Sequence, residues 1–145
     1  MLRKWTENDL NAICELEKQC FNDPWSLEML KGEFELNGFL GYLIEENGEI
    51  VAYAGFSSVL DEGNLDLIAV SENHRRKGYA KQLANKAFSE LVKNGVTKVF
   101  LEVRKKNAAA ISLYELLGFN RIGERLNYYG NDDAVMMVKF LEENL

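Results

Sequence analysis

A basic turn is the first stretch of this sequence whose residue types could do chemistry. Residues 73–81 hold four of the 17 lysines and arginines and the only histidine of a chain with net charge −6. The turn follows an apolar run, 67–70, and precedes an amphipathic helical pattern, so it lies at a helix N-terminus. Free N–H groups and the positive end of the helix dipole attract anions there. We therefore expect this turn to hold a phosphate group.

The spacing within the turn supports that expectation. In Arg75-x-x-Gly78-x-Ala80, the glycine lets backbone N–H groups approach an anion closely, and the small Ala80 leaves the first helical turn uncrowded. Neither common nucleotide fingerprint, G-x-G-x-x-G or G-x-x-x-x-G-K-S/T, occurs in the chain. A solvated loop is the alternative, and the position between a strand and a helix favours the anion site.

Glu102 is the second chemical candidate, a carboxylate in a strand that we expect to be central. Val99, Leu101 and Val103 form one face of this strand, and Glu102 lies on the opposite face. A carboxylate there is costly unless it is paired, hydrated or used. An ion pair with Arg104, on the same face, is one explanation. The other is a general base, since burial favours uptake of the proton that an ammonium substrate must lose.

The pattern of apolar residues predicts the elements that position these groups. Strands are expected at 2–5, 39–46, 49–59, 65–70, 98–103, 119–125 and 134–141, and helices at 6–20, 27–36, 78–93 and 107–117. Asn47-Gly48 predicts a two-residue hairpin turn, and 61–64 predicts another turn. Three consecutive strands make an antiparallel meander. The strand, helix and strand from 65 to 103 make a right-handed parallel βαβ unit, so the fold class is α/β with a mixed, mostly antiparallel sheet.

Composition limits the class of protein. A chain of 145 residues fits a single domain, 1–145. It has no apolar run near the ~18 residues of a membrane helix and no signal core, so we expect a cytoplasmic protein without a membrane partner. Cys14 and Cys20 are expected to be reduced, and a single histidine argues against a metal. The negative charge argues against direct nucleic-acid binding and favours a basic partner.

These features together resemble the GNAT superfamily of acyl-CoA-dependent N-acetyltransferases across nearly the whole chain. The basic turn matches the family's (Gln or Arg)-x-x-Gly-x-(Gly or Ala) motif, which wraps the pyrophosphate of coenzyme A. The chain is most similar to the ribosomal-protein-alanine, or RimI-type, branch. The residues that carry this likeness are Phe21-x-x-Pro24-Trp25-Ser26, Leu101-Glu102-Val103-Arg104, Asn107, Ala110, Leu113-Tyr114, Gly118-Phe119, Arg125, Tyr128-Tyr129, Asp133-Ala134 and Met136. Asp132 departs conservatively from the glutamate common at its position.

The resemblance implies a GNAT fold and a role for each matching residue. The strand should separate from the Glu102 strand after 68–70, and acetyl-CoA should bind in that splay as co-substrate, without a metal. Glu102 would be the base and Tyr114 the acid that protonates the departing thiolate. The implied coenzyme contacts are Ile68, Ala69, Val70, Arg75, Arg76, Lys77, Gly78, Tyr79, Ala80, Lys81 and Asn107, the last also capping its helix. Trp25, Tyr128 and Tyr129 would wall the acceptor groove, although ordinary core or loop packing also explains such aromatics.

The acceptor that the resemblance implies is a protein or peptide N-terminus. In the branch named above it is the N-terminal alanine of a ribosomal protein, acetylated by direct transfer. An acetyltransferase for small amines or lysine side chains would use the same catalytic pair. A non-catalytic acyl-CoA-binding module is a further alternative, but it needs neither Glu102 nor Tyr114. We expect a monomer.

Overall fold

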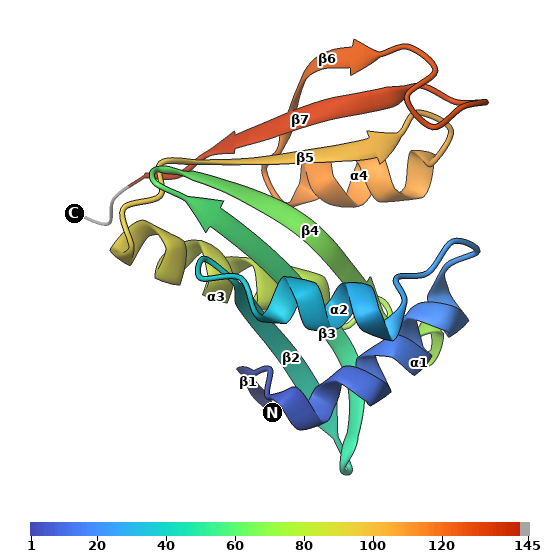
Figure 1. Ribbon diagram of the computed structural model, residues 1–145, viewed down its shortest axis with the longest axis vertical. Helices are drawn as coiled ribbons and strands as arrows, with labels where there is room; N and C mark the ends of the chain where they lie inside the picture. Colours follow the sequence, from blue (N-terminus) through green and yellow to red (C-terminus); the bar gives the residue numbers. More distant parts are fainter. Residues whose placement is uncertain (143–145) are drawn as a thin grey trace.

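The computed structural model describes residues 1–142 and contains a seven-stranded sheet in the order β1-β2-β3-β4-β5-β7-β6 (Figure 1). The strands are β1 (Leu2–Lys4), β2 (Leu40–Glu46), β3 (Glu49–Val59), β4 (Glu62–Val70), β5 (Lys98–Arg104), β6 (Asn120–Arg125) and β7 (Ala134–Phe140). The helices are α1 (Leu10–Cys20), α2 (Leu27–Phe34), α3 (Tyr79–Lys93) and α4 (Ala108–Leu116), with short 3-10 turns η1 (Glu7–Asp9) and η2 (Glu72–His74). The predicted α/β class and mixed sheet are confirmed.

The antiparallel meander is β2-β3-β4, and one of its two predicted turns is misplaced. Asn47 and Gly48 form the expected hairpin turn, with φ of 53° and 80°. The turn predicted at 61–64 is wrong: Val59 pairs with Glu62, so the turn is Leu60-Asp61. Residues 62–64 instead pair with β3 on one side and β5 on the other. Pairing on both sides outweighs the local turn preference of a Gly-Asn sequence.

The unit β4-α3-β5 is the predicted parallel βαβ, but β4 and β5 pair only at their beginnings. Asn64 opposite Phe100 is the last pair of their ladder, and beyond it the strands diverge (Figure 1). The separation therefore begins at Leu65, ahead of the position predicted after 68–70. As a result, the second half of β4 and the second half of β5, which carries Glu102, face each other across an open splay.

Each face of the sheet has its own core. α3 and α4 pack on one face, and the predicted apolar stripe of α3 is buried there: Ala80, Leu83, Ala84, Ala87, Phe88 and Leu91. α1 and α2 pack on the other face of the meander, against Leu43, Tyr53 and Leu67. Alternation along β5 places Val99, Leu101 and Val103 in the first core. Glu102 therefore points to the α1/α2 side.

Local caps set where the helices begin. Thr6 and Asp9 form a capping box ahead of α1, and the Ser26 hydroxyl accepts from the Met29 N–H at 3.1 Å to start α2. The Asn107 side chain accepts from the Ala110 N–H at 3.1 Å, which confirms its predicted capping of α4. Among residues 1–142, none of the helices has the length and apolar character that crossing a membrane requires.

Candidate active site

A cavity of about 560 Å³ opens where β4 and β5 separate. Its walls come from the α1–α2 loop, β4, β5, β6, the β6–β7 loop and β7: Trp25, Asn64, Leu65, Asp66, Phe100, Leu101, Glu102, Arg125, Tyr128 and Met136. The cavity therefore brings together three residues singled out in the sequence, namely Trp25, Glu102 and Tyr128. They come from segments up to 103 residues apart, so the fold, rather than local sequence, assembles this site.

Glu102 is partly accessible from this cavity. Its side chain is 29% exposed, which is less buried than the sequence suggested, and its Oε1 lies 3.6 Å from Nη2 of Arg125. The ion pair considered in the sequence, with Arg104, is wrong. The Arg104 guanidinium instead lies over the ring of Tyr129, 4.4 Å from its centroid. Glu102 is thus a carboxylate that a ligand can reach, balanced by one neighbouring cation.

Tyr114 lies on α4, on the face of the sheet opposite to Glu102, and is not among the residues that line the cavity. Its ring packs edge-on against Phe119, with centroids 6.2 Å apart, and belongs to the core under α3 and α4. Burial, with a smaller effect of Tyr129, raises the pKa of Tyr114 to about 12. The phenol is therefore protonated at neutral pH, as a proton donor must be.

The β6–β7 loop places two tyrosines beside Glu102. Tyr128 is half exposed and lies under the Arg125 guanidinium, 5.4 Å from the ring centroid. Tyr129 packs edge-on against it at 5.1 Å and is absent from the residues lining the cavity. Burial first, and then the charge of Glu102, raise the pKa of the Tyr129 hydroxyl. Tyr129 is therefore a packing partner of the site rather than part of its wall.

Two aspartates hold that loop in place. Asp132 is 8% exposed, and its Oδ2 accepts from the Lys106 N–H at 3.1 Å. Asp133 Oδ1 accepts from the Asn127 N–H at 2.8 Å. The Asp132 bond joins the loop to the connection between β5 and α4, and the Asp133 bond closes the loop on itself. The conservative change at Asp132 leaves a carboxylate that still performs this anchoring.

A buried glutamate fixes the loop that carries Trp25. Glu17, on α1, is 2% exposed; its Oε1 accepts from the Trp25 N–H at 3.0 Å, and its Oε2 accepts from the Tyr53 hydroxyl. Burial and the neighbouring Glu17 raise the pKa of Tyr53 well above its usual range. One side chain therefore links α1, β3 and the cavity wall.

The open edge of β4 offers backbone groups to the splay. The Ser71 N–H donates to the Val51 carbonyl of β3 at 2.8 Å. Antiparallel strands bond a given neighbour through every second residue, so Ala69 also bonds β3 while Ile68 and Val70 direct their N–H and C=O groups toward the splay. The Val70 carbonyl accepts from Arg75 Nε at 3.1 Å. Arg75 therefore helps to fold the basic turn back onto this strand.

Glu46, at the end of β2, organises the basic turn. Its carboxylate accepts a hydrogen bond from the Tyr79 hydroxyl at 2.5 Å. It also lies 3.0 Å from His74 Nε2 and 3.7 Å from Lys77 Nζ. The hydrogen bond from Tyr79, followed by the nearby cations, lowers the pKa of Glu46. Glu46 therefore balances part of the positive charge that the sequence predicted would attract an anion.

The remaining features of the turn match an anion site. Gly78 has a φ of 78°, and a Cβ built there would meet nothing within 4 Å. It starts α3 without a side-chain cap, so among residues 1–142 no capping side chain satisfies the first N–H groups of the helix. Arg76 and Lys81 are exposed, and within residues 1–142 neither lies within ion-pair distance of a carboxylate.

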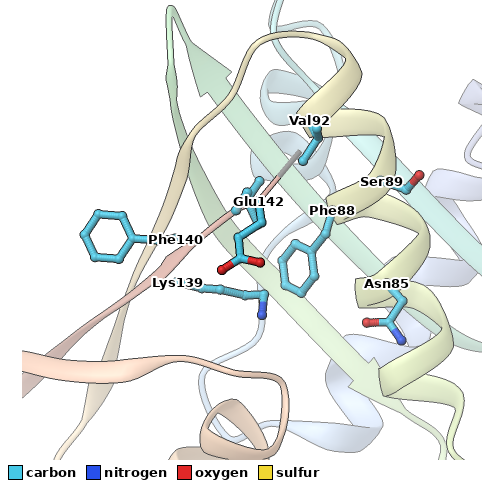
Figure 2. Close-up of a pocket in the computed structure, with 8 residues that line it drawn as sticks. Asn85, Phe88, Ser89, Val92, Lys139, Phe140 and Glu142 are labelled. Atoms are coloured by element: carbon cyan, nitrogen blue, oxygen red, sulfur yellow. The ribbon is translucent and has the colours of Figure 1, made fainter. Parts of the chain in front are cut away.

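A second cavity, of about 490 Å³, lies between α3 and the end of β7 (Figure 2). Asn85, Phe88 and Lys139 are among the side chains that line it. Lys139 lies over the Phe88 ring, 5.2 Å from its centroid. The lining contains neither Glu102 nor any residue of the basic turn.

Sequence reasoning missed Arg125 and Asp66, which line the cavity, and two buried glutamates behind its wall, Glu17 on α1 and Glu33 on α2. Arg125 was noted only as part of a family likeness. Glu17 sits on the inner stripe of α1, where a charged residue is itself a signal. Asp66 interrupts the otherwise apolar run 65–70, which marks it in the same way. Glu33 gave no comparable signal.

The fold and the cavity are those of an acetyltransferase, and comparison with known proteins supports this class. Residues 10–119 match the model of the Acetyltransferase (GNAT) family. The chain belongs to this family, as its motifs predicted.

The relatives narrow the likeness to one branch. The chain is 40% identical over 133 residues to the ribosomal protein bS18-alanine N-acetyltransferase of Escherichia coli (strain K12), covering 89% of each chain. It is 36% identical over 138 residues to the enzyme of the same name from Haemophilus influenzae, covering 92% of this chain and 93% of the relative. The crystal structure of the ribosomal-protein-S18-alanine N-acetyltransferase from Escherichia coli superposes with a TM-score of 0.89 at 34% identity, covering 100% and 96% of the two chains.

Proposed function

We propose that this protein transfers the acetyl group of acetyl-CoA to the N-terminal amine of a protein, with a ribosomal protein that begins with alanine as the expected acceptor. The observation that carries the proposal is the cavity between β4 and β5, where Glu102 meets Trp25 and Tyr128. The identity to two alanine N-acetyltransferases supports the choice of acceptor.

The donor site combines the basic turn and the edge of β4. Acetyl-CoA supplies an acetyl thioester and an anionic pyrophosphate. The uncapped start of α3 at Gly78, together with Arg76 and Lys81, fits that anion by geometry and charge. Backbone N–H groups of Ile68 and Val70 can bind the extended arm and polarise the thioester carbonyl. In this arrangement Asn107 caps α4 beside the coenzyme.

Glu102 acts as the general base on the acceptor side. It takes a proton from the incoming ammonium, directly or through a water molecule, and the neutral amine then forms the C–N bond as the C–S bond breaks. Holding both reactants in one splay supplies orientation. Arg125 must yield its place beside Glu102 as the cationic amine arrives, because both compete for the same carboxylate.

Tyr114 completes the proton transfers from the other side of the sheet. Its phenol, with a pKa of about 12, gives a proton to the leaving thiolate. The transfer is direct and leaves no covalent enzyme intermediate. Trp25 and Tyr128 provide the walls between which the acceptor backbone enters.

A panel of acceptors tests this proposal. The protein is incubated with acetyl-CoA and three substrates: a peptide beginning with alanine, the same peptide with a blocked N-terminus and an internal lysine, and a small polyamine. Mass spectrometry locates the acetyl group. We expect modification of the free alanine amine. Acetylation of only the lysine or the polyamine would assign the enzyme a different acceptor, and coenzyme binding without turnover on any acceptor would make it a binding module.

A further inference from the structure

Two carboxyl groups that the mechanism does not use meet beside the acceptor cavity. Glu33, on α2, is 8% exposed, and Asp66, on β4, lines the cavity. Glu33 Oε2 and Asp66 Oδ2 are both buried, and among residues 1–142 neither finds a conventional hydrogen-bond donor. Two carboxylates cannot bond each other, because both are acceptors; a bond between them requires one to carry a proton.

The proton belongs to Glu33. Burial, followed by the hydrogen bond to Asp66 and its charge, raises the pKa of Glu33 to about 9. Glu33 therefore holds the proton of this pair at pH 7 and donates it in a hydrogen bond to Asp66. The carboxyl group of Asp66 thus lies in the cavity wall, and the buried Glu33 holds it there through a hydrogen bond.

A bulge in β4 puts Asp66 in this position. Leu67 pairs with Gly55 and Leu65 pairs with Phe56, so Asp66 is an extra residue without a partner in β3. Such bulges re-aim a side chain, and this one lies two residues beyond the last pair between β4 and β5. Asp66 therefore lies where β4 and β5 begin to separate, on the cavity wall that β4 contributes.

The charges around the cavity leave Asp66 without compensation. Of the charged residues that line it, Glu102 and Arg125 pair with each other. Within the described part of the chain, neither Glu33 nor Asp66 forms an ion pair with a lysine, arginine or histidine. A poorly solvated carboxylate without a cation is costly, and a cation brought by a ligand would offset that cost.

We propose that Asp66, held by Glu33, binds a basic side chain next to the N-terminal residue of the acceptor. The inference rests on the proposed function and adds a selection rule to it: a lysine or arginine close to the acetylated residue favours the substrate. Glu102 remains the group that takes the proton from the N-terminal amine. In this scheme Asp66 is a specificity-determining residue and Glu33 a positioning residue.

Matched peptides test the rule. Two peptides that begin with alanine differ only at the second residue, arginine in one and glutamine in the other, and steady-state rates are measured for wild type, Asp66→Asn and Glu33→Gln. For wild type, kcat/KM should be about ten- to a hundredfold higher for the arginine peptide, mainly through KM. Asp66→Asn should abolish that preference, because it should lower kcat/KM for the arginine peptide about ten- to a hundredfold more than for the glutamine peptide. Glu33→Gln should retain it, because an amide still donates to Asp66.

Glu49→Gln is the charge-matched control. It removes one carboxylate from the exposed start of β3, outside the cavity lining, and should leave the preference intact. Equal wild-type rates on the two peptides, or an equal loss on both in Asp66→Asn, would overturn the inference while leaving N-terminal acetylation in place. Absence of acetylation at either N-terminus would instead overturn the proposed function.

Discussion

At the scale of single residues, the site depends on a carboxylate whose partner the sequence could not identify. Glu102 lies on the α1/α2 side of β5 and pairs with Arg125, which arrives from β6. From the sequence alone, the ion-pair partner that can be suggested for Glu102 is a residue two positions away on the same strand, such as Arg104. The cross-strand pairing depends on how β6 adds to β7, which no local pattern reports.

Changing Glu102 to Gln tests the base. The amide keeps the shape of the side chain but cannot take a proton, so kcat should fall by about 10²–10⁴-fold while coenzyme A binds as in wild type. Glu124→Gln, on β6, is the control: its carboxylate pairs with Lys105 at 3.2 Å outside the cavity. The measurements are single-turnover acetylation and calorimetric titration with coenzyme A. Near wild-type rates for Glu102→Gln across the pH range would remove Glu102 from this role.

Tyr114→Phe tests the acid from the opposite side of the sheet. Loss of the hydroxyl should lower kcat by about 10²-fold, since the thiolate then leaves without a positioned proton. Because the pKa of Tyr114 is raised to about 12, any fall in the wild-type rate between pH 8 and about 10 cannot come from its ionisation. A pH–rate profile of both proteins checks this. Unchanged kcat in Tyr114→Phe would assign the proton to another donor.

At the scale of elements, the start of α3 makes a prediction with a built-in control. Gly78 and Gly95 both have positive φ, 78° and 86°, and at both a Cβ would meet nothing within 4 Å. Alanine at either position should therefore cost about 1 kcal/mol of unfolding free energy through backbone strain alone. Gly78→Ala should also weaken coenzyme A binding, because the Cβ obstructs the helix N–H groups; Gly95→Ala, past the other end of α3, should not. Chemical denaturation and coenzyme titration separate the two effects, and equal affinities for both variants would contradict the assignment of the anion site.

The same elements show how far sequence reasoning reached. The stripe of α3, the cap at Asn107 and the Asn47-Gly48 hairpin follow from periods and residue types within a few positions, and the structure confirms them. Two errors share one cause. The misplaced turn at 61–64 and the early separation of β4 from β5 both depend on what pairs with residues 62–64 from a distant strand. The bulge at Asp66 could not be predicted for the same reason, since an extra residue is recognised only when both strands are aligned.

At the scale of the whole molecule, two carboxyl groups couple folding to pH in opposite directions. The hydrogen bond from Arg3 lowers the pKa of Asp9 from its ordinary 3.8 to about 2. This contribution to stability is present above pH 3.8 and is lost as the pH falls toward 2. Asp9→Asn should therefore destabilise the protein by about 1–3 kcal/mol at pH 7 and by progressively less below pH 4. Thermal unfolding of both proteins at several pH values measures this difference, and a penalty that stays constant down to pH 2 would contradict it.

Glu33 changes the stability of the protein with pH in the opposite direction to Asp9. Its pKa is raised from 4.5 to about 9, so the folded protein binds a proton that the unfolded chain has already released. Stability attributable to this group therefore falls as the pH rises from about 4.5 to about 9. Glu33→Gln keeps a donor for Asp66 without this titration, so the variant should be more stable than wild type by about 1–3 kcal/mol at pH 8, with the gain vanishing near pH 4.5. Denaturant unfolding of both proteins at pH 8 and at pH 4.5 measures this difference in unfolding free energy. A variant that gains stability and keeps its preference for a basic second residue would show that the cost lies in the titrating acid, while the carboxylate of Asp66 serves the acceptor.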